Sequence, residues 1–296
     1  MKKTDSKKVE EKPILKNIPT KYDDRKTKFK RLYKNNELSK LRLKNDYVDN
    51  VLQHAWLIDN YIAKFGFVEE DAPENTIKAY KNAIKKGYPI LIQVQMLDDG
   101  EIVCFNGKVL STTTKASGYI SKLTLDELKE IKICDTNETI PTLEEALNVI
   151  AGKVPVVIDI NNDGTVGKFE QKVSDILDDY IVKHNLFDSV AVMSLNPYTL
   201  EWFLAQAPWF PRILRSGKFK VKMYGSIKAK QLTKLKLFKI ALPDFICYNA
   251  KDLPNRYVKH VKPVCVIAYN VKNQQEYMEV AKHCDNIIFT GFEPCI

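Results

Sequence analysis

From Tyr61 onward the chain alternates short apolar runs with segments of helical periodicity, and this alternation limits the available folds more than any other feature. The runs VPVVIDI (154–160), SVAVMSL (189–195) and NIIFTGF (286–292) are almost continuously apolar, as expected of strands buried on both faces. Between such runs lie amphipathic segments, including PENTIKAYKNAIKKG (73–87) and KFEQKVSDILDDYIVKHN (168–185), which favour helices. The alternation predicts an α/β fold whose parallel sheet is covered by helices on both sides.

The number of strands favours a closed barrel over an open sheet. Further strands are predicted over 61–67, 89–96, 101–106, 210–216, 244–249 and 264–270, and a helix over 274–284. The segments TLDELKEI (124–131) and TLEEALNVIAG (142–152) are predicted helices, because each places a glutamate three residues after its first threonine. A (β/α)8 barrel typically needs about 250 residues, which a chain of 296 supplies. The sequence has no G-x-G-x-x-G motif to favour a dinucleotide-binding sheet.

The net charge of +9 is concentrated at the N-terminus. Residues 1–45 contain 16 Lys and Arg against 6 Asp and Glu, which leaves 30 basic and 31 acidic residues in the remainder. We therefore expect two parts: a basic, partly disordered arm over 1–45 and a barrel over 46–296, with a helix over 36–57 leading into it. The arm is either a solvated tail or an electrostatic contact for an anionic membrane or a protein partner, and nucleic acid is the least favoured partner.

Location and redox state follow from what the sequence lacks. It has no run of about 18 apolar residues and no apolar stretch behind its basic start, so we expect a cytoplasmic protein, with peripheral membrane attachment as the alternative. No C-x-x-C pair occurs, so buried, reduced thiols are expected at all six cysteines: Cys104, Cys134, Cys247, Cys265, Cys284 and Cys295.

In a barrel of this kind the chemistry lies at the carboxyl ends of the strands. The polar residues predicted there are Lys64, Gln93, Asn106, Asp159, Asn161, Ser194, Arg215, Asn249, Tyr269, Asn270 and Thr290. This set contains one carboxylate and no histidine. The four histidines, His54, His184, His260 and His283, fall on or near predicted helices, where surface or packing roles are expected.

Several longer stretches resemble the glycerophosphodiester phosphodiesterase family, across roughly Asp59 to Cys295. They are APENT (72–76), DDGEIVCFNGKVLSTTTKASGYISKLTLDEL (98–128), IPTLEEAL (140–147), KVPVVIDIN (153–161), SLNP (194–197), DFICYNAKDLP (244–254) and DNIIFTGFEP (285–294). The resemblance implies a TIM barrel of the PLC-like phosphodiesterase type. It also implies hydrolysis of glycerophosphodiesters to glycerol 3-phosphate and an alcohol, using two histidines, an arginine and a carboxylate-bound divalent metal.

Most positions that the resemblance assigns to this chemistry hold other residues here. The first histidine falls on Lys64 and its arginine on Phe65, followed by the retained Gly66. The metal-binding Glu-x-Asp pair falls on Leu91 and Gln93, and the third metal carboxylate falls on Asp159. The second histidine falls on Asn106 and the aspartate after it on Gly107. A lysine of the family falls on Asn161, and an aromatic residue falls on Tyr269.

These replacements predict a catalytically inactive barrel that binds a phosphoester or a regulatory partner. Asparagine exchanges no proton near neutral pH, and a lysine does so only when its pKa is strongly lowered. The predicted ligand is a glycerophosphodiester or another phosphorylated small molecule, held by Lys64, Gln93, Asn106, Asn161 and Tyr269. Lys64 is alternatively solvated or paired with Asp159. The alternative function is an active phosphoric diester hydrolase with a rearranged site built on Lys64 and Asp159.

No cofactor is expected, and Ca²⁺ is the alternative. DINNDGTVGKFE (159–170) matches the calcium-loop pattern D-x-[DN]-x-[DN]-G-x5-E through Asp159, Asn161, Asp163, Gly164 and Glu170. Its context differs from that of an EF-hand, because a predicted strand, and not a helix, precedes the loop. An ordinary strand-to-helix connection explains the same turn-forming residues.

Overall fold

The structure is a computed structural model that describes residues 54–186, 188–219, 225–261 and 264–295. The predicted arm over 1–45 lies outside the described residues, as does most of the helix predicted over 36–57. The first described helix is α4 (Trp56–Asp59).

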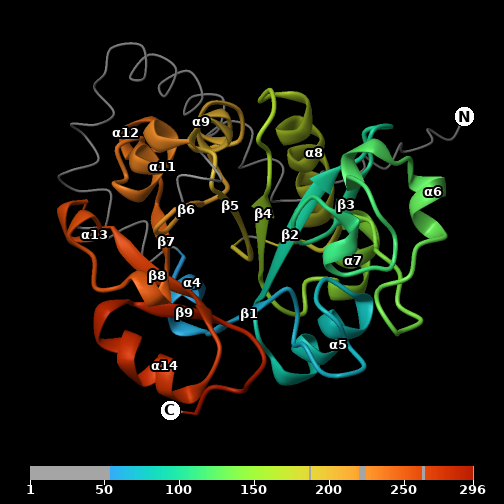
Figure 1. Ribbon diagram of the computed structural model, residues 1–296, viewed down its shortest axis with the longest axis horizontal. Helices are drawn as coiled ribbons and strands as arrows, with labels where there is room; N and C mark the ends of the chain where they lie inside the picture. Colours follow the sequence, from blue (N-terminus) through green and yellow to red (C-terminus); the bar gives the residue numbers. More distant parts are fainter. Residues whose placement is uncertain (1–53, 187, 220–224, 262–263, 296) are drawn as a thin grey trace, which may run out of the picture.

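Eight parallel strands close into a barrel, as the sequence predicts (Figure 1). They are β1 (Ile62–Lys64), β2 (Ile90–Met96), β4 (Val156–Ile160), β5 (Val190–Ser194), β6 (Arg212–Ser216), β7 (Phe245–Asn249), β8 (Cys265–Val271) and β9 (Asn286–Phe289). The barrel closes because β1 pairs in parallel with both β2 and β9. The remaining predicted strand, β3 (Ile102–Cys104), pairs antiparallel with β2 and lies outside the ring.

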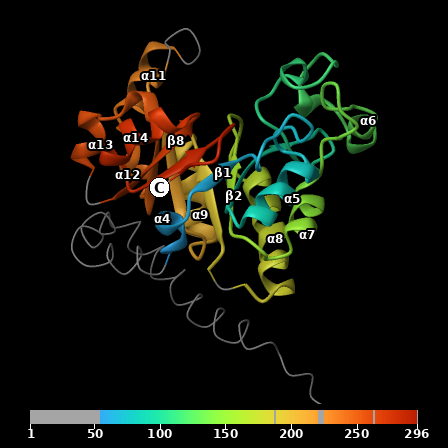
Figure 2. The same cartoon turned by 90° about the horizontal axis from the view of Figure 1, so that it is seen from below.

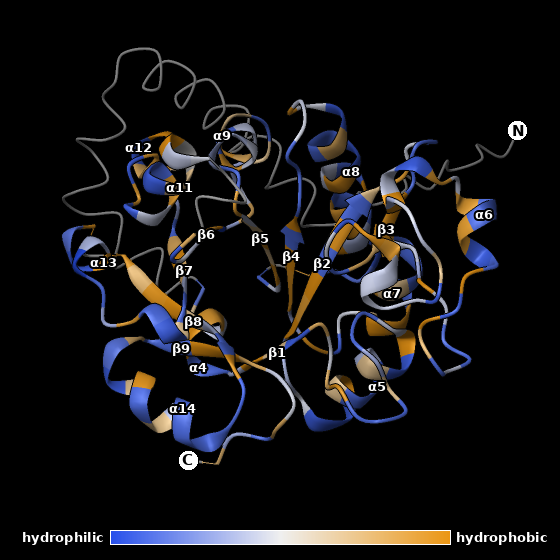
Figure 3. Cartoon of the chain, in the orientation of Figure 1, coloured by the Kyte–Doolittle hydropathy of each residue, from blue (hydrophilic) through white to orange (hydrophobic). Residues whose placement is uncertain are grey.

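Helices surround this ring. They are α5 (Ile77–Lys86), α7 (Leu143–Ile150), α8 (Lys168–Lys183), α9 (Pro197–Gln206), α11 (Ser226–Thr233), α12 (Phe238–Ala241), α13 (Arg256–His260) and α14 (Gln274–Val280). Two predicted helix starts are capping boxes, at α7 and at the short α6 (Leu125–Lys129), in which a threonine and the glutamate three residues later bond each other's backbone. Figure 3 shows the hydrophobic colour of β2 and β8 against a mostly hydrophilic α14.

The barrel has separate inner and outer cores. Inward side chains such as Leu91, Val157 and Ile267 form one buried cluster, and the outer faces of the strands pack against the helices in another. Leu57 of α4 joins the inner cluster, and Asn286, the first residue of β9, donates hydrogen bonds of 2.8 Å to the carbonyls of Leu57 and Asn60. Helix α4 therefore covers the amino ends of the strands and leaves the carboxyl ends as the mouth.

An insert over 105–142 follows β3 and carries α6 together with two short 3-10 helices, Leu110–Thr112 and Ile120–Lys122. It has its own small apolar core, which includes Phe105, Leu110 and Leu128. Figure 2 shows this insert and α11 on opposite sides of the barrel.

The histidines lie away from the mouth strands, as predicted. His54 packs beside α4, where its Nδ1 lies 2.5 Å from Oδ1 of Asp188. The cysteine prediction is correct for Cys104, Cys247 and Cys265, which are buried thiols. It is wrong for Cys134 and Cys295, which are exposed because one lies in a turn of the insert and the other beside the C-terminus. No described helix is long and apolar enough to cross a bilayer.

Candidate ligand site at the barrel mouth

The end of β1 makes a tight turn that places Lys64 at the mouth. Phe65 and Gly66 both have positive φ, +60° and +92°. A Cβ on Gly66 would lie 2.7 Å from the backbone of Ala79, so only glycine lets α5 approach this closely. Phe65 is 3% exposed and belongs to the inner core, so the side chain after Lys64 points down into the barrel and not into the mouth.

Lys64 is held by an amide and not by a carboxylate. Its Nζ donates a 2.7 Å hydrogen bond to Oδ1 of Asn270 and lies 4.8 Å from the centre of the Phe65 ring. Asn270 is turned toward Lys64 by a register shift in β8 and by its own left-handed φ of +65°. Among the described residues, no carboxylate lies within ion-pair distance of Lys64. Burial lowers the pKa of Lys64, and nearby Glu74 opposes that shift.

Asp159 lies deeper and is paired with Arg215. It is 1% exposed, accepts a 2.6 Å hydrogen bond from Nε2 of Gln93, and lies 3.3 Å from Nε of Arg215. Burial raises the pKa of Asp159, and the Arg215 guanidinium is the largest opposing influence. The predicted alternative of a Lys64–Asp159 pair is therefore wrong, because β6 projects Arg215 into the barrel on the side of Asp159 and Lys64 bonds Asn270.

A second polar network fixes the loop after β3. Gln93 accepts a 2.8 Å hydrogen bond from the amide of Gly107, and Gln95 donates one of 2.6 Å to the carbonyl of the same residue. Asn106, held beside Gly107, donates a 2.7 Å hydrogen bond to Oε1 of Glu74. Both ends of the Gln93 amide are thus engaged by protein groups, so its role in this geometry is to position Asp159 and the loop.

Two charged residues of the mouth have no role in the sequence prediction, Glu74 and Arg215. Glu74 lies in the APENT turn and not at a strand end, so the strand-end pattern does not select it. Arg215 lies at a predicted strand end, but its pairing with Asp159 depends on the barrel closing.

The other predicted ligand-binding residues lie near the same end of the barrel. Tyr269, at the β8 end, is half-buried, and burial raises its pKa to about 12, so its hydroxyl is a hydrogen-bond donor at neutral pH. Asn161, just after β4, is half-buried, and its backbone amide donates a hydrogen bond to the carbonyl of Val94. The mouth therefore combines two cations, Lys64 and Arg215, with two carboxylates, Glu74 and Asp159, and with neutral hydrogen-bonding groups.

The donor set at the mouth does not fit a divalent metal. Leu91 is 2% exposed and packs in the inner core, Gln93 is engaged at both ends, and Asp159 already faces a guanidinium. Hard cations need several free oxygen ligands. Within the described part of the chain, no three His, Cys, Asp or Glu side chains form a group that could hold a metal ion.

The residues of the calcium pattern have separate partners. Asp163 is exposed and forms an ion pair with Lys108. Glu170 is fully buried and accepts hydrogen bonds from Asn162, the Gly167 amide and Thr199, of 2.8, 2.7 and 2.6 Å. Glu170 therefore fixes the start of α8, while Asp159 faces the barrel interior.

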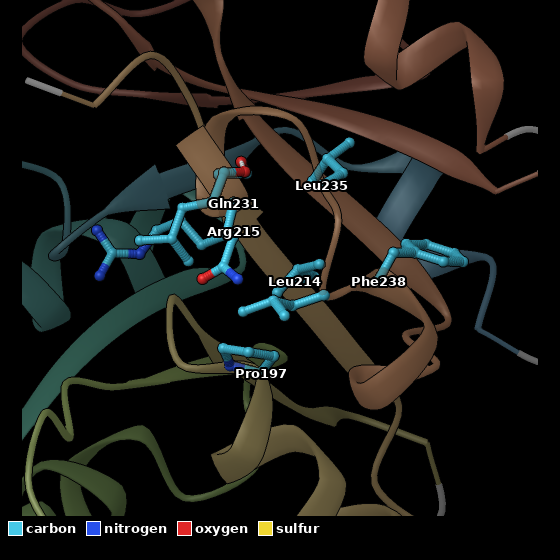
Figure 4. Close-up of a pocket in the computed structure, with 9 residues that line it drawn as sticks. Pro197, Leu214, Arg215, Gln231, Leu235 and Phe238 are labelled. Atoms are coloured by element: carbon cyan, nitrogen blue, oxygen red, sulfur yellow. Dashed lines mark hydrogen bonds between the residues drawn. The ribbon is translucent and has the colours of Figure 1, made fainter. Parts of the chain in front are cut away.

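A small hollow lies behind β6, on the side away from the barrel interior. It is lined mainly by apolar side chains of β6, α9, α11 and α12, including Leu214, Leu235 and Phe238. Figure 4 shows the Arg215 guanidinium extending away from these side chains. The hollow is thus separate from the ion pair at the mouth.

Comparison with known proteins places this barrel in a family. A sequence model described as the glycerophosphoryl diester phosphodiesterase family matches residues 68–283, which is more than half of the chain. The chain belongs to the glycerophosphoryl diester phosphodiesterase family.

Individual relatives agree with this assignment. The chain is 31% identical over 148 residues to a glycerophosphodiester phosphodiesterase of Caldanaerobacter subterraneus, a match that covers 47% of this chain and 59% of that relative. It is 24% identical over 199 residues to a Bacillus subtilis glycerophosphodiester phosphodiesterase, covering 61% and 67%. The chain thus spans about three fifths to two thirds of the length of these family members.

Solved structures support the fold. An Oleispira antarctica phosphodiesterase, solved in complex with sn-glycerol-3-phosphate, superposes with a TM-score of 0.64 at 20% identity, covering 80% of this chain and 94% of that one. A glycerophosphodiester phosphodiesterase from Thermotoga maritima superposes with a TM-score of 0.58 at 17% identity, covering 78% and 94%. At these identities the likeness concerns the barrel alone.

Proposed function

We propose that this family member binds a phosphoester at the barrel mouth without hydrolysing it, and that Lys64 and Arg215 supply the positive charge for binding. The observation that carries the proposal is the Arg215–Asp159 pair, which sets a guanidinium against the carboxylate that the family resemblance assigns to metal binding. With Arg215 in that place, a protein cation balances the charge of Asp159 and no divalent ion is needed there.

The two cations suit a phosphate group in different ways. A guanidinium presents a planar fork of donors to phosphate oxygens, whereas an ammonium acts as a compact charge with three donors. Asn106, Asn161 and Tyr269 offer neutral donors and acceptors for the glycerol or alcohol part of the ligand. Gln93 serves in this scheme by holding Asp159 and Gly107 in place.

Weak or absent hydrolysis follows from the groups present. A general acid or base must reach the reacting oxygen and exchange a proton near neutral pH. Among the described strand ends there is no histidine, Asp159 is buried against Arg215 and Gln93, and the carboxylate of Glu74 accepts a hydrogen bond from Asn106. Loss of one such group typically costs about 10²–10⁴-fold in rate.

Calorimetric titration in the presence of EDTA tests the binding, with glycerol 3-phosphate and glycerophosphocholine as probes. We expect binding by the native chain, and at least about tenfold weaker binding by Lys64→Met, because a cation that touches phosphate contributes a charge-assisted hydrogen bond. Lys272→Met is the matched control, since Lys272 is exposed and influences Lys64 only through its charge.

Incubating the same probes with the protein, with added Mg²⁺ in place of EDTA, separates the alternative. Consumption of glycerophosphocholine by the native chain, lost in Lys64→Ala or Asp159→Ala, would support a hydrolase with a rearranged site. Equal binding by the native chain and Lys64→Met would remove Lys64 from the ligand site.

A further inference from the structure

The segment between β5 and β7 has a charge imbalance that the overall count conceals. Between Glu201 and Asp244 the chain has ten Lys and Arg and no Asp or Glu. Residues 46–296 as a whole are close to neutral, so this positive stretch is balanced by carboxylates elsewhere in the sequence.

Four of these lysines form an exposed surface on α11, α12 and the turn between them. We call Lys230, Lys234, Lys236 and Lys239 the α11–α12 lysine surface; all four are exposed. Within the described residues, none of them has a carboxylate partner, and Lys234 instead lies 5.8 Å from the centre of the Tyr257 ring.

Five lysines elsewhere on the barrel contrast with this surface. Lys78, Lys86, Lys108, Lys115 and Lys172 each form an ion pair with an Asp or Glu. The α11–α12 lysine surface thus combines a high local density of ammonium groups with no neutralising carboxylate among the residues described. Such a surface attracts an extended anionic partner.

The backbone beneath these lysines is anchored. Leu232, Leu235 and Ala241 are buried. Leu235 and Ala241 pack in one cluster with Leu214 of β6 and Ile246 of β7. These buried residues thus anchor the segment on the barrel while the lysines between them remain exposed, which presents their ammonium groups on a packed support.

One apolar side chain is exposed beside the lysines. Ile227, in the first turn of α11, is 73% exposed, the highest value among the described large hydrophobic residues. Because α11 follows β6, this turn lies toward the mouth, and Figure 2 shows α11 projecting at the end of the barrel opposite α4.

We propose that the α11–α12 lysine surface docks the barrel on an anionic lipid bilayer, with Ile227 entering the interfacial layer. Lysines attract anionic headgroups, and an exposed aliphatic side chain gains from contact with the acyl boundary but gains little from a nucleic-acid backbone. This attachment is distinct from the predicted role of the arm over 1–45, and it would bring the mouth close to lipid headgroups.

Vesicle co-sedimentation with the full chain tests the proposal, using phosphatidylcholine vesicles with and without phosphatidylglycerol. The test variant is K230Q/K234Q/K236Q/K239Q. The control is K81Q/K85Q/K153Q/K282Q, which removes the same charge from exposed lysines on other faces. Both keep the arm intact. A lysine at an anionic surface contributes about fivefold to partitioning, so we expect at least about tenfold weaker binding by the test variant and less than about threefold by the control.

Ile227→Ser adds a test that does not depend on charge, with Met278→Ser as its control because Met278 is 69% exposed on α14. We expect Ile227→Ser alone to weaken binding to the anionic vesicles. No vesicle binding by the native chain, equal losses in the two lysine variants, or retention of the test variant would overturn the proposal. Tighter binding to a duplex oligonucleotide than to anionic vesicles would also overturn it.

Discussion

Replacing Arg215 by methionine tests whether the guanidinium compensates the buried carboxylate of Asp159. Arg215→Met preserves much of the side-chain length but leaves Oδ1 of Asp159, now 3.3 Å from Nε, without its cation. Asp159 is 1% exposed with Arg215 in place, so its carboxylate has little contact with water that could compensate its charge. Gln93 still donates to the other carboxylate oxygen.

The loss of stability in Arg215→Met depends on whether Asp159 stays ionised or takes up a proton. If Asp159 stays ionised, breaking a buried pair costs about 3–5 kcal/mol. If it takes up a proton, the cost at pH 7 is about 4 kcal/mol for a group whose ordinary pKa is 3.8. Burial already raises the pKa of Asp159 in the native protein, so part of this cost is present before the mutation. We expect a net loss of about 2–3 kcal/mol at pH 7, or about 4–12 °C in melting temperature.

The sign of the pH dependence follows from protonation. A carboxyl group whose pKa is higher in the folded than in the unfolded state destabilises the protein increasingly as the pH rises above the unfolded pKa. Lowering the pH between these two pKa values therefore reduces the destabilisation by about 1.4 kcal/mol per pH unit. Arg215→Met should therefore lose much less stability at pH 5 than at pH 7.

Thermal melts of four proteins at the two pH values measure the effect: the native chain, Arg215→Met, Asp159→Asn and the double variant. We expect the double variant to regain most of the stability lost by Arg215→Met, because no uncompensated carboxylate remains. Equal losses at pH 5 and pH 7, together with additive effects in the double variant, would show that Arg215 contributes packing alone.

Two further predictions concern stability away from the mouth pair. Burial raises the pKa of Asp178 to about 7, although a hydrogen bond from Trp209 opposes this shift. Asp178→Asn should therefore stabilise the fold by about 2 kcal/mol at pH 8, after allowance for partial exposure, and hardly at all at pH 4. Urea titrations at the two pH values check this, and a pH-independent difference would contradict it. Gly66→Ala should cost about 3 kcal/mol or more, because its Cβ would meet the Ala79 backbone at 2.7 Å, whereas Gly107→Ala has the same φ of +92° with open space and should cost about 1–2 kcal/mol. Equal melting temperatures for the two alanine variants would contradict the steric argument.

The barrel itself could be predicted because its determinants are local. Short apolar runs predict the nine strands of the described residues, and the threonine and glutamate pairs predict the starts of α6 and α7. Helix α9 was not predicted, although Asn196 caps its first turn and Pro197 begins it, because the apolar residues that follow have no clear helical stripe.

Side-chain partners at the mouth could be predicted only in part. The strand ends identified Lys64, Asp159 and Arg215, but their pairing depends on which neighbours the closed barrel brings together. The contact from Asn270 to Lys64 requires a register shift and a left-handed φ that have no distinctive sequence signal.

The lysine surface illustrates a different limit. Its signal was present in the sequence, as basic residues without acidic ones between Glu201 and Asp244, but a sum over residues 46–296 cancels it. The fold then decides which of these lysines are exposed and unpaired.

Glycerol 3-phosphate release from glycerophosphocholine, measured with Mg²⁺, Ca²⁺ or Mn²⁺, tests the central claim most directly. The native chain should be compared with the variant Lys64→His, Phe65→Arg, Leu91→Glu, Gln93→Asp and Asn106→His, which restores the residues implied by the family resemblance. We predict no release by the native chain under any metal, and metal-dependent release by the restored variant. Release by the native chain that disappears in Lys64→Ala would contradict the proposed loss of catalysis and make this barrel a hydrolase with a rearranged site.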